Sequence, residues 1–379
     1  MFDDDYDDEY YRKVIIDNGS GYIKAGLKGE EGPRCVFPTC VGYPKYQGGG
    51  MIGGKKGEFY VGDDAQAKRG VLKLNYPIEN GIINNWDDME KIWRHIFENE
   101  LRVAPEESYV LLTESSKYNT DNRRTMAQIM FEDFHVPSLY IANPAALSLI
   151  DNRAYTGIAI ESGDGVIKIV PVFDFYVITH AIMHLDLAGR DLTEYMKRLL
   201  LETGKNFSTS SEMEIVKAIK EKACYVAFDF EKEIKSVEPY EYKLPDGESI
   251  IIKDQRIKCP EALFKPELIQ KEGKSLPQTC NDSILKCDID IRKELYYNIV
   301  LSGGTSMFNG LPERLRKEMN SFNSDEMYNE IRVIDSRDRK YSAWRGGNII
   351  SSISSFESHY ITRSEYEEFG ANIVHRKCF

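Results

Sequence analysis

The chain has 379 residues, 42% of them hydrophobic and 29% charged, which is enough for about two domains with separate cores. Its net charge of −12 argues against nucleic-acid binding, because the chain would repel phosphates. The seven cysteines form no CxxC pair, which indicates reduced thiols rather than a disulfide framework or a zinc site. An acidic N-terminus and the absence of an uncharged run near the roughly 20 residues of a membrane helix predict a soluble, intracellular α/β protein.

The first expected element is an acidic head at residues 3–9, which we predict to be disordered. It is either a solvated tail or an attachment site for a basic partner.

Two glycine-rich turns repeat one pattern. Residues 17–24 (DNGSGYIK) and residues 161–168 (ESGDGVIK) each follow an apolar triplet and contain an acid, two alternating glycines and a final lysine. Each copy predicts a strand, a tight turn in which glycine lets the backbone approach a ligand, and a return strand. The repeat indicates a duplicated domain.

Other segments lie between and beyond these turns. Residues 47–54 (QGGGMIGG) predict a mobile loop with a small apolar tip, which is either a linker or a segment that enters a partner's pocket. Residues 87–102 and 211–230 carry apolar residues at helical spacing.

A third glycine site lies at residues 298–308 (NIVLSGGTSMF), where a short apolar strand leads into Gly303, Gly304 and Thr305, followed by a helix through residues 311–315. A strand, a glycine turn and a helix start present backbone N–H groups to an anion or a base.

The chemistry of the turns favours a nucleotide. We expect Asp17 and Glu161 to lie at strand ends and face each other, where paired carboxylates suit a Mg²⁺ ion that keeps its water. Lys24 would contact phosphate as a point charge. A lone acid or lysine at a strand end is usually a surface charge, but the repeat favours a pair of phosphate clamps.

The sequence resembles the actin family from residue 14 to residue 379. The motifs that carry the resemblance occur in the same order as in actins: IDNGSG (16–21), YPIENGI (76–82), DLAGRDLTEY (186–195), KCDIDIRK (286–293), LSGGTSM (301–307), RKYSAWRGG (339–347) and HRKCF (375–379).

The resemblance implies an α/β fold of the duplicated ribonuclease-H-like type, shared with chaperone ATPases and sugar kinases, with two domains of two subdomains each around a nucleotide cleft. The implied bounds are residues 1–38, 77–151 and 342–379 for subdomain 1; 39–76, with a docking loop at 46–57, for subdomain 2; 152–187 and 272–341 for subdomain 3; and 188–271 for subdomain 4.

The resemblance also implies ATP or ADP with Mg²⁺ or Ca²⁺ as ligands. The residues that would hold them are Gly19, Ser20, Gly21, Tyr22 and Lys24 on one side; Asp164, Gly165 and Val166 on the other; Gly189, Lys217, Lys220 and Glu221 beside the adenosine; and Gly303, Gly304, Thr305, Met307, Phe308 and Lys340. The implied partners are other actin subunits, and actin-binding proteins at a cleft near Ile350, Ile353 and Tyr360.

Three departures from the family concern hydrolysis. Pro144 replaces a glutamine that orients the attacking water, and proline has no side-chain donor or acceptor. Glu161 replaces an aspartate and is longer by one methylene. Lys168 replaces a histidine; a lysine is normally protonated and cannot accept a proton near neutral pH. It would pair with Glu161 or act as a second phosphate clamp. Asn80 replaces another histidine outside this group.

Asn143 has two interpretations. It is either the N-cap of a helix that begins at Pro144, or its amide substitutes for the missing glutamine. Polymer contacts are also altered, since residues 268–271 (LIQK) replace a more apolar plug, Tyr46 replaces a histidine and Tyr360 a tryptophan.

We therefore predict an ATP-binding, actin-like cytoskeletal protein of the cytoplasm that forms or joins filaments and hydrolyses ATP slowly. The alternative is an actin-related monomer locked in a larger complex of the cilium or nucleus, such as a dynein arm or a chromatin remodeller, with a structural nucleotide. A phosphotransferase would need a general base and a sugar pocket, and the sequence suggests neither.

Overall fold

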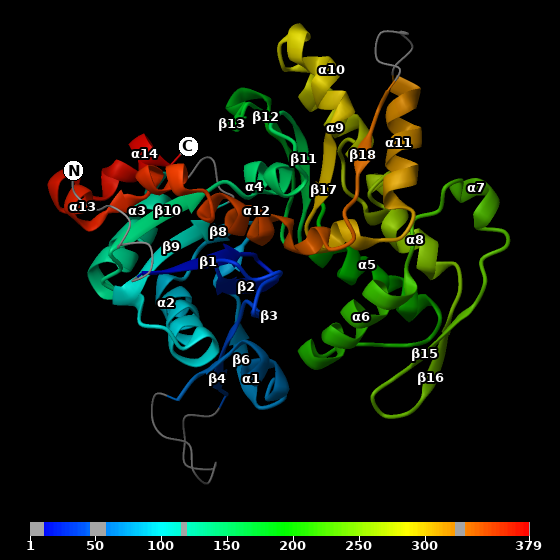
Figure 1. The fold of residues 1–379 in the computed structure, drawn as a ribbon. Helices are drawn as coiled ribbons and strands as arrows, with labels where there is room; N and C mark the ends of the chain where they lie inside the picture. Colours follow the sequence, from blue (N-terminus) through cyan, green and yellow to red (C-terminus); the bar gives the residue numbers. More distant parts are fainter. Residues whose placement is uncertain (1–10, 46–57, 115–119, 323–329, 379) are drawn as a thin grey trace. The chain divides into compact units, whose positions relative to one another are not determined.

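The computed structural model describes residues 11–45, 58–114, 120–322 and 330–378. The predicted acidic head and the loop at 46–57 lie outside these ranges. The chain divides into two compact units, each with its own hydrophobic core: Met1–Arg153 with Tyr341–Phe379 (unit 1), and Ala154–Lys340 (unit 2) (Figure 1). In the described ranges, no helix has the length and apolar character needed to cross a membrane.

Unit 1 is built on a six-stranded sheet in the order β19-β10-β9-β1-β2-β3. β1 pairs antiparallel with β2 and parallel with β9, so it lies inside the sheet. Its residues Val14, Ile15 and Ile16 are fully buried, as expected for a central strand covered on both faces. The strands are β1 Arg12–Asn18, β2 Tyr22–Leu27, β3 Cys35–Pro38, β9 Ser108–Thr113, β10 Ser138–Ala142 and β19 Ile361–Thr362.

Helices and smaller sheets complete unit 1. The helix predicted at 87–102 is confirmed as α2 with a terminal π-helical turn, η1. α4 and α12 pack so closely that a Cβ on Gly346 would lie 1.9 Å from the Leu147 carbonyl oxygen, which only glycine allows. The elements are α1 Gly62–Ala67, α2 Trp86–His95, η1 Ile96–Leu101, α3 Thr120–Gln128, η3 Ile129–Asp133, α4 Pro144–Asp151, α12 Ser342–Ser351, α13 Arg363–Phe369 and α14 Val374–Lys377, with β4 Val41–Pro44, β5 Tyr60–Val61, β6 Leu72–Asn75, β7 Ile78–Glu79 and β8 Ile82–Ile83.

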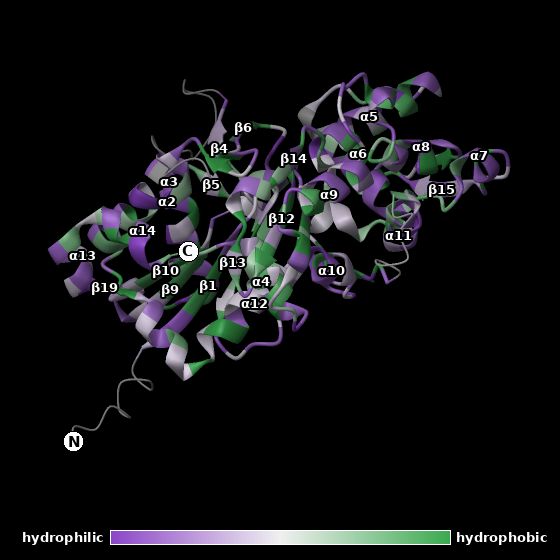
Figure 2. Ribbon diagram, turned by 90° about the horizontal axis from the view of Figure 1, so that it is seen from above, coloured by the Kyte–Doolittle hydropathy of each residue, from purple (hydrophilic) through white to green (hydrophobic). Residues whose placement is uncertain are grey.

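Unit 2 is built on a second sheet in the order β13-β12-β11-β17-β18, with β14 also paired to β12. β11 pairs antiparallel with β12 and parallel with β17, which matches the relation of β1 to β2 and β9. In Figure 2 the hydrophobic colour follows strands such as β12, whereas the outlying helix α7 is hydrophilic. The strands are β11 Gly157–Ser162, β12 Ile167–Phe173, β13 Tyr176–Val177, β14 Met183–Leu185, β17 Ile299–Ser302 and β18 Val333–Ile334.

The helix predicted at 211–230 is too long. α6 ends at Ala223, because Cys224 turns to an extended backbone and the next amides bond elsewhere. Tyr225 N donates to the Arg256 carbonyl and Val226 N to the Asn309 carbonyl, so tertiary partners replace the helical ones. The helices of unit 2 are α5 Gly189–Glu202, α6 Ser210–Ala223, α7 Phe230–Glu233, α8 Gln255–Glu261, α9 Leu276–Leu285, α10 Ile289–Tyr297 and α11 Leu311–Phe322, with the hairpin β15 Tyr240–Lys243 and β16 Ser249–Ile252.

The strand and the helix predicted around the third glycine site are confirmed as β17 and α11. A 3-10 turn, η6 Gly304–Met307, follows β17, and α11 begins only after Gly310. Gly310 has a φ of 80°, and a Cβ there would lie 2.3 Å from the Val226 carbonyl oxygen. Gly303 and Gly304 open the short 3-10 turn, and the predicted helix follows it as α11.

Candidate nucleotide-binding turns

The first turn connects β1 to β2 and carries a bonded carboxylate. Asp17 and Lys24 are cross-strand partners, and Lys24 Nζ lies 2.8 Å from Asp17 Oδ2. Thr113, the last residue of β9, donates from Oγ1 to Asp17 Oδ1 at 2.8 Å. Both oxygens thus have a donor, and the orientation of the carboxylate is fixed.

Thr113 was not predicted from the sequence. Its hydroxyl also accepts from Asn18 N at 2.9 Å, and Asn18 Nδ2 donates to the Thr113 carbonyl at 3.0 Å. Thr113 reaches the turn because β9 runs parallel to β1 in one particular register. The only sequence signal is a threonine at the end of a strand, which does not reveal that register.

The backbone of the first turn is crowded. A Cβ on Gly19 would lie 2.5 Å from the Tyr22 carbonyl oxygen, so this position requires glycine. Thr39 Oγ1 donates to the Gly19 carbonyl at 2.6 Å, and the Gly21 carbonyl accepts from Thr39 N. Ser20 Oγ accepts from Gly81 N at 3.1 Å and keeps its proton for a further acceptor. The turn is therefore held by its own unit before any ligand binds.

The second turn connects β11 to β12 with the same register. Glu161 and Lys168 are cross-strand partners, as Asp17 and Lys24 are in the first turn. Lys168 is buried, with 6% of its surface exposed. Gly163 N donates to the Val166 carbonyl at 3.1 Å and closes the turn, in which Gly165 is half-buried.

Three segments of unit 2 meet at the Gly163 carbonyl oxygen. It accepts from Gly189 N, at the start of α5, at 3.1 Å, and from Thr305 Oγ1 at 2.7 Å. A Cβ on Gly189 would lie 2.4 Å from Thr305 Oγ1, and one on Gly303 would lie 2.5 Å from the Ser162 carbonyl oxygen. The structure therefore brings together the second turn, Gly189 and the third glycine site.

Asp164 is tied to the same helix start. Its carbonyl accepts from Arg190 N at 2.8 Å, and its carboxylate Oδ2 lies 3.5 Å from Arg190 Nη2.

Lys220 of α6 is buried, and its ammonium group contacts the start of α5. Its ammonium donates to the Gly189 carbonyl at 2.7 Å and to Thr193 Oγ1 at 2.9 Å. Burial lowers the pKa of Lys220, and no described carboxylate pairs with it. A lysine ammonium has three donors, so one remains for a ligand. Thr193 is a second residue that the sequence did not indicate.

The other expected adenosine contacts differ in exposure. Lys217 and Met307 are half-buried, and Glu221, Gly304 and Lys340 are exposed. Phe308 packs into the core of unit 2, where it supports the turn that precedes it.

Asn143 and Pro144 form a helix start in unit 1. Asn143 is the N-cap of α4, its Oδ1 accepts from Ala145 N at 2.9 Å, and Pro144 is the first helical residue. The helix-start interpretation is confirmed. The cap hydrogen bond fixes the orientation of the Asn143 side chain at the start of the helix.

The second turn and the third glycine site, both in unit 2, offer donors that suit a phosphate group. Ser162 Oγ, at the end of β11, is a buried atom without a hydrogen-bond partner in the described structure, and the Gly304 Cα faces open space. For a metal, the described residues contain no cluster of three or more histidine, cysteine, aspartate or glutamate side chains. Asp17 and Glu161 each lie near the end of a strand, and a carboxylate can accept hydrogen bonds from the water that Mg²⁺ retains.

The predicted partner surface requires a correction. Ile350 and Tyr360 are buried in the core of unit 1, with 7% and 2% of their surfaces exposed, so a partner cannot contact them. Successive residues of a helix point about 100° apart, and the outward side of α12 carries Ile349 instead. Ile349 and Ile353, 41% and 48% exposed, are the apolar residues that remain available.

The architecture and the turns are those of an α/β protein with two similar sheets, each carrying a glycine turn after its central strand. A family model described as Actin matches residues 8–379, nearly the whole chain. The chain therefore belongs to the actin family, whose members bind ATP or ADP with a divalent cation and interact with other actin subunits and with binding proteins.

Proposed function

We propose that this chain is a divergent, ATP-binding cytoskeletal actin that forms or joins filaments in the cytoplasm and hydrolyses ATP slowly. Its fold would be the duplicated ribonuclease-H-like one, with four subdomains. The observation that carries the nucleotide proposal is the shared carbonyl of Gly163, which holds the second turn, Gly189 and Thr305 in one place. Those segments are the ones that the family resemblance assigns to phosphate and adenosine.

The roles of the residues follow from their contacts. The amides of the two turns and Lys24 would bind phosphate, while Asp17, held by Lys24 and Thr113, would accept from the water shell of Mg²⁺. Lys220 would offer its third N–H to the nucleoside.

Slow hydrolysis is supported by the residues that replace the usual hydrolytic residues of the family. The Asn143 side-chain oxygen accepts a hydrogen bond in the helix cap, Pro144 has no polar side-chain atom, and a lysine ammonium has no lone pair. Neither Pro144 nor a protonated Lys168 offers a neutral acceptor in place of the usual glutamine and histidine.

Restoring the usual family residues at positions 144, 161 and 168 tests the proposal of slow hydrolysis directly. We expect the triple variant P144Q/E161D/K168H to release phosphate in a single turnover with Mg-ATP at least 10-fold faster than the unchanged chain. N80H is the matched control, because it restores a histidine outside the three positions and should not change the rate. Phosphate release by the unchanged chain at the rate of an ordinary actin would refute slow hydrolysis.

One observation favours the alternative, a monomer in a larger complex. Lys271, in the segment that replaces an apolar filament plug, bonds to Asp191 of its own chain at 2.8 Å, and Ile269 is buried. That segment is thus occupied by contacts within its own unit. Sedimentation in polymerising salt separates the two functions: a pellet supports the filament, and a species that remains monomeric or purifies within a stable complex supports the alternative.

A further inference from the structure

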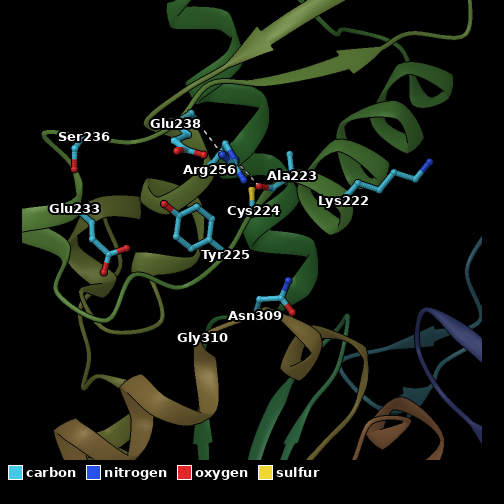
Figure 3. Close-up of a pocket in the computed structure, with 10 residues that line it drawn as sticks. All are labelled: Lys222, Ala223, Cys224, Tyr225, Glu233, Ser236, Glu238, Arg256, Asn309 and Gly310. Carbon is cyan, nitrogen blue, oxygen red and sulfur yellow. Dashed lines mark hydrogen bonds between the residues drawn. The ribbon is translucent and has the colours of Figure 1, made fainter.

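A polar cavity of about 400 Å³ lies in unit 2, beside the C-terminal end of α6 (Figure 3). Its lining comes from four separate segments: the end of α6 with Tyr225, the stretch with Glu233 and Glu238, Arg256 of α8, and Asn309 after the third glycine site. Lys222 points away from it. None of the residues assigned to the nucleotide lines this cavity.

Arg256 presents one unoccupied edge. Its Nε donates to the Ala223 carbonyl at 2.8 Å and its Nη1 to the Glu238 carbonyl at 2.6 Å. The guanidinium also lies over two rings, 5.0 Å from the centroid of Tyr225 and 5.3 Å from that of Tyr240. No described residue accepts from Nη2 or pairs a carboxylate with this charge. A guanidinium fixed by stacking and by two carbonyls is ready to receive a carboxylate on its remaining edge.

A carboxylate of opposite sign lies in the same lining. Glu233 Oε1 accepts from Asp229 N at 3.1 Å, and no described residue donates to Oε2. Burial, and after it the charge of Glu233, raise the pKa of Tyr225, which places that carboxylate near the tyrosine ring. The Tyr225 hydroxyl therefore stays protonated and can donate.

We propose that this cavity binds a small zwitterion of the α-amino-acid class, with its carboxylate on the free edge of Arg256 and its ammonium group on Glu233. A simple anion would gain Arg256 but meet Glu233 and Glu238, and a simple cation would gain the glutamates but meet Arg256. A ligand with both charges avoids each repulsion. The inference does not depend on the nucleotide proposal.

Calorimetric titration of the full chain tests the charge requirement. The probes are L-phenylalanine, L-leucine and L-glutamine, compared with 3-phenylpropionate, which lacks the ammonium group, and phenethylamine, which lacks the carboxylate. We expect at least one amino acid to bind, and the two single-charge analogues of phenylalanine to bind at least 10-fold more weakly than the best amino acid. If no amino acid binds, or if an analogue binds as well, the proposal is overturned.

Two variants assign the contacts. E233Q keeps the oxygen that accepts from Asp229 N and loses the negative charge, so it should weaken binding of the amino acid at least 10-fold. R256K keeps the positive charge and loses the planar guanidinium edge, so it should also weaken binding of the amino acid at least 10-fold. E231Q is the matched control, because Glu231 is an exposed acid bonded to Lys265 and does not line the cavity. Equal affinity in E233Q and E231Q would contradict the assignment of Glu233, and unchanged affinity in R256K would leave Arg256 a purely structural link.

Discussion

Replacing Thr113 by valine tests how the first turn orients Asp17. Valine has nearly the same shape, but it removes the hydroxyl that donates to Asp17 Oδ1 at 2.8 Å and accepts from Asn18 N at 2.9 Å. A hydrogen bond to a charged group contributes about 1.5–3 kcal/mol, and a buried donor left alone costs about 1–3 kcal/mol. T113V should therefore lower the free energy of unfolding of unit 1 by about 2–4 kcal/mol.

The matched control is T113S, which keeps the hydroxyl and loses one methyl group, at a cost of about 1 kcal/mol. The assay is urea unfolding followed by hydrogen exchange of β1 and β9 amides, so that unit 1 is observed by itself. T113V should also raise the Mg²⁺ concentration needed for ATP binding, while T113S should not. If T113V is as stable as T113S, the hydroxyl does not hold the carboxylate and the reasoning fails.

The remaining predictions concern the structure around the site. E261L should destabilise the chain by about 1.5–3 kcal/mol in thermal unfolding, because Arg314 would lose its buried carboxylate partner and keep only Glu318, and R314M in the same chain should recover most of the loss. F175G should raise the melting temperature or leave it unchanged, since Phe175 has a φ of 69° that costs about 1–2 kcal/mol for a residue with a side chain; a clear fall would contradict this. Burial raises the pKa of the Cys378 thiol from near 9 to about 11, so alkylation measured by mass spectrometry should stay slow at pH 9 and accelerate toward pH 11. The stability that this neutral thiol contributes is complete below pH 9 and lost as the pH rises to about 11. R123A, which loses the bond to the Cys378 carbonyl, should allow alkylation at lower pH, and an unchanged rate would mean that Arg123 does not anchor the C-terminal segment.

Short sequence patterns predicted those contacts of the site that are made between residues close together in the chain. The acid and the lysine of each turn lie seven residues apart, and a tight hairpin makes them cross-strand partners, as observed for Asp17 with Lys24 and Glu161 with Lys168. The N-cap at Asn143 followed from the preference for asparagine before a first-turn proline.

The contacts that fix these turns depend on long-range register, which one sequence does not reveal. Thr113 reaches Asp17 across a parallel pairing, and Thr305 reaches the Gly163 carbonyl from the 3-10 turn η6, 142 residues further along the chain. The end of α6 at Ala223 depends in the same way on amide partners distant in the sequence.

The family motifs also did not predict which individual residues are buried. Adjacent residues of α12 have opposite environments, Ile349 exposed and Ile350 buried, and a motif that names the segment does not say which one faces a partner.

The central claim is that the chain holds ATP and cleaves it slowly. The most direct measurement mixes purified chain with γ-labelled Mg-ATP in a single turnover and counts bound nucleotide and released phosphate in the same sample. We predict close to one bound ATP per chain, with most of the label still bound after the time in which an ordinary actin would have released its phosphate. An absence of bound nucleotide, or release at the ordinary rate, would contradict the account.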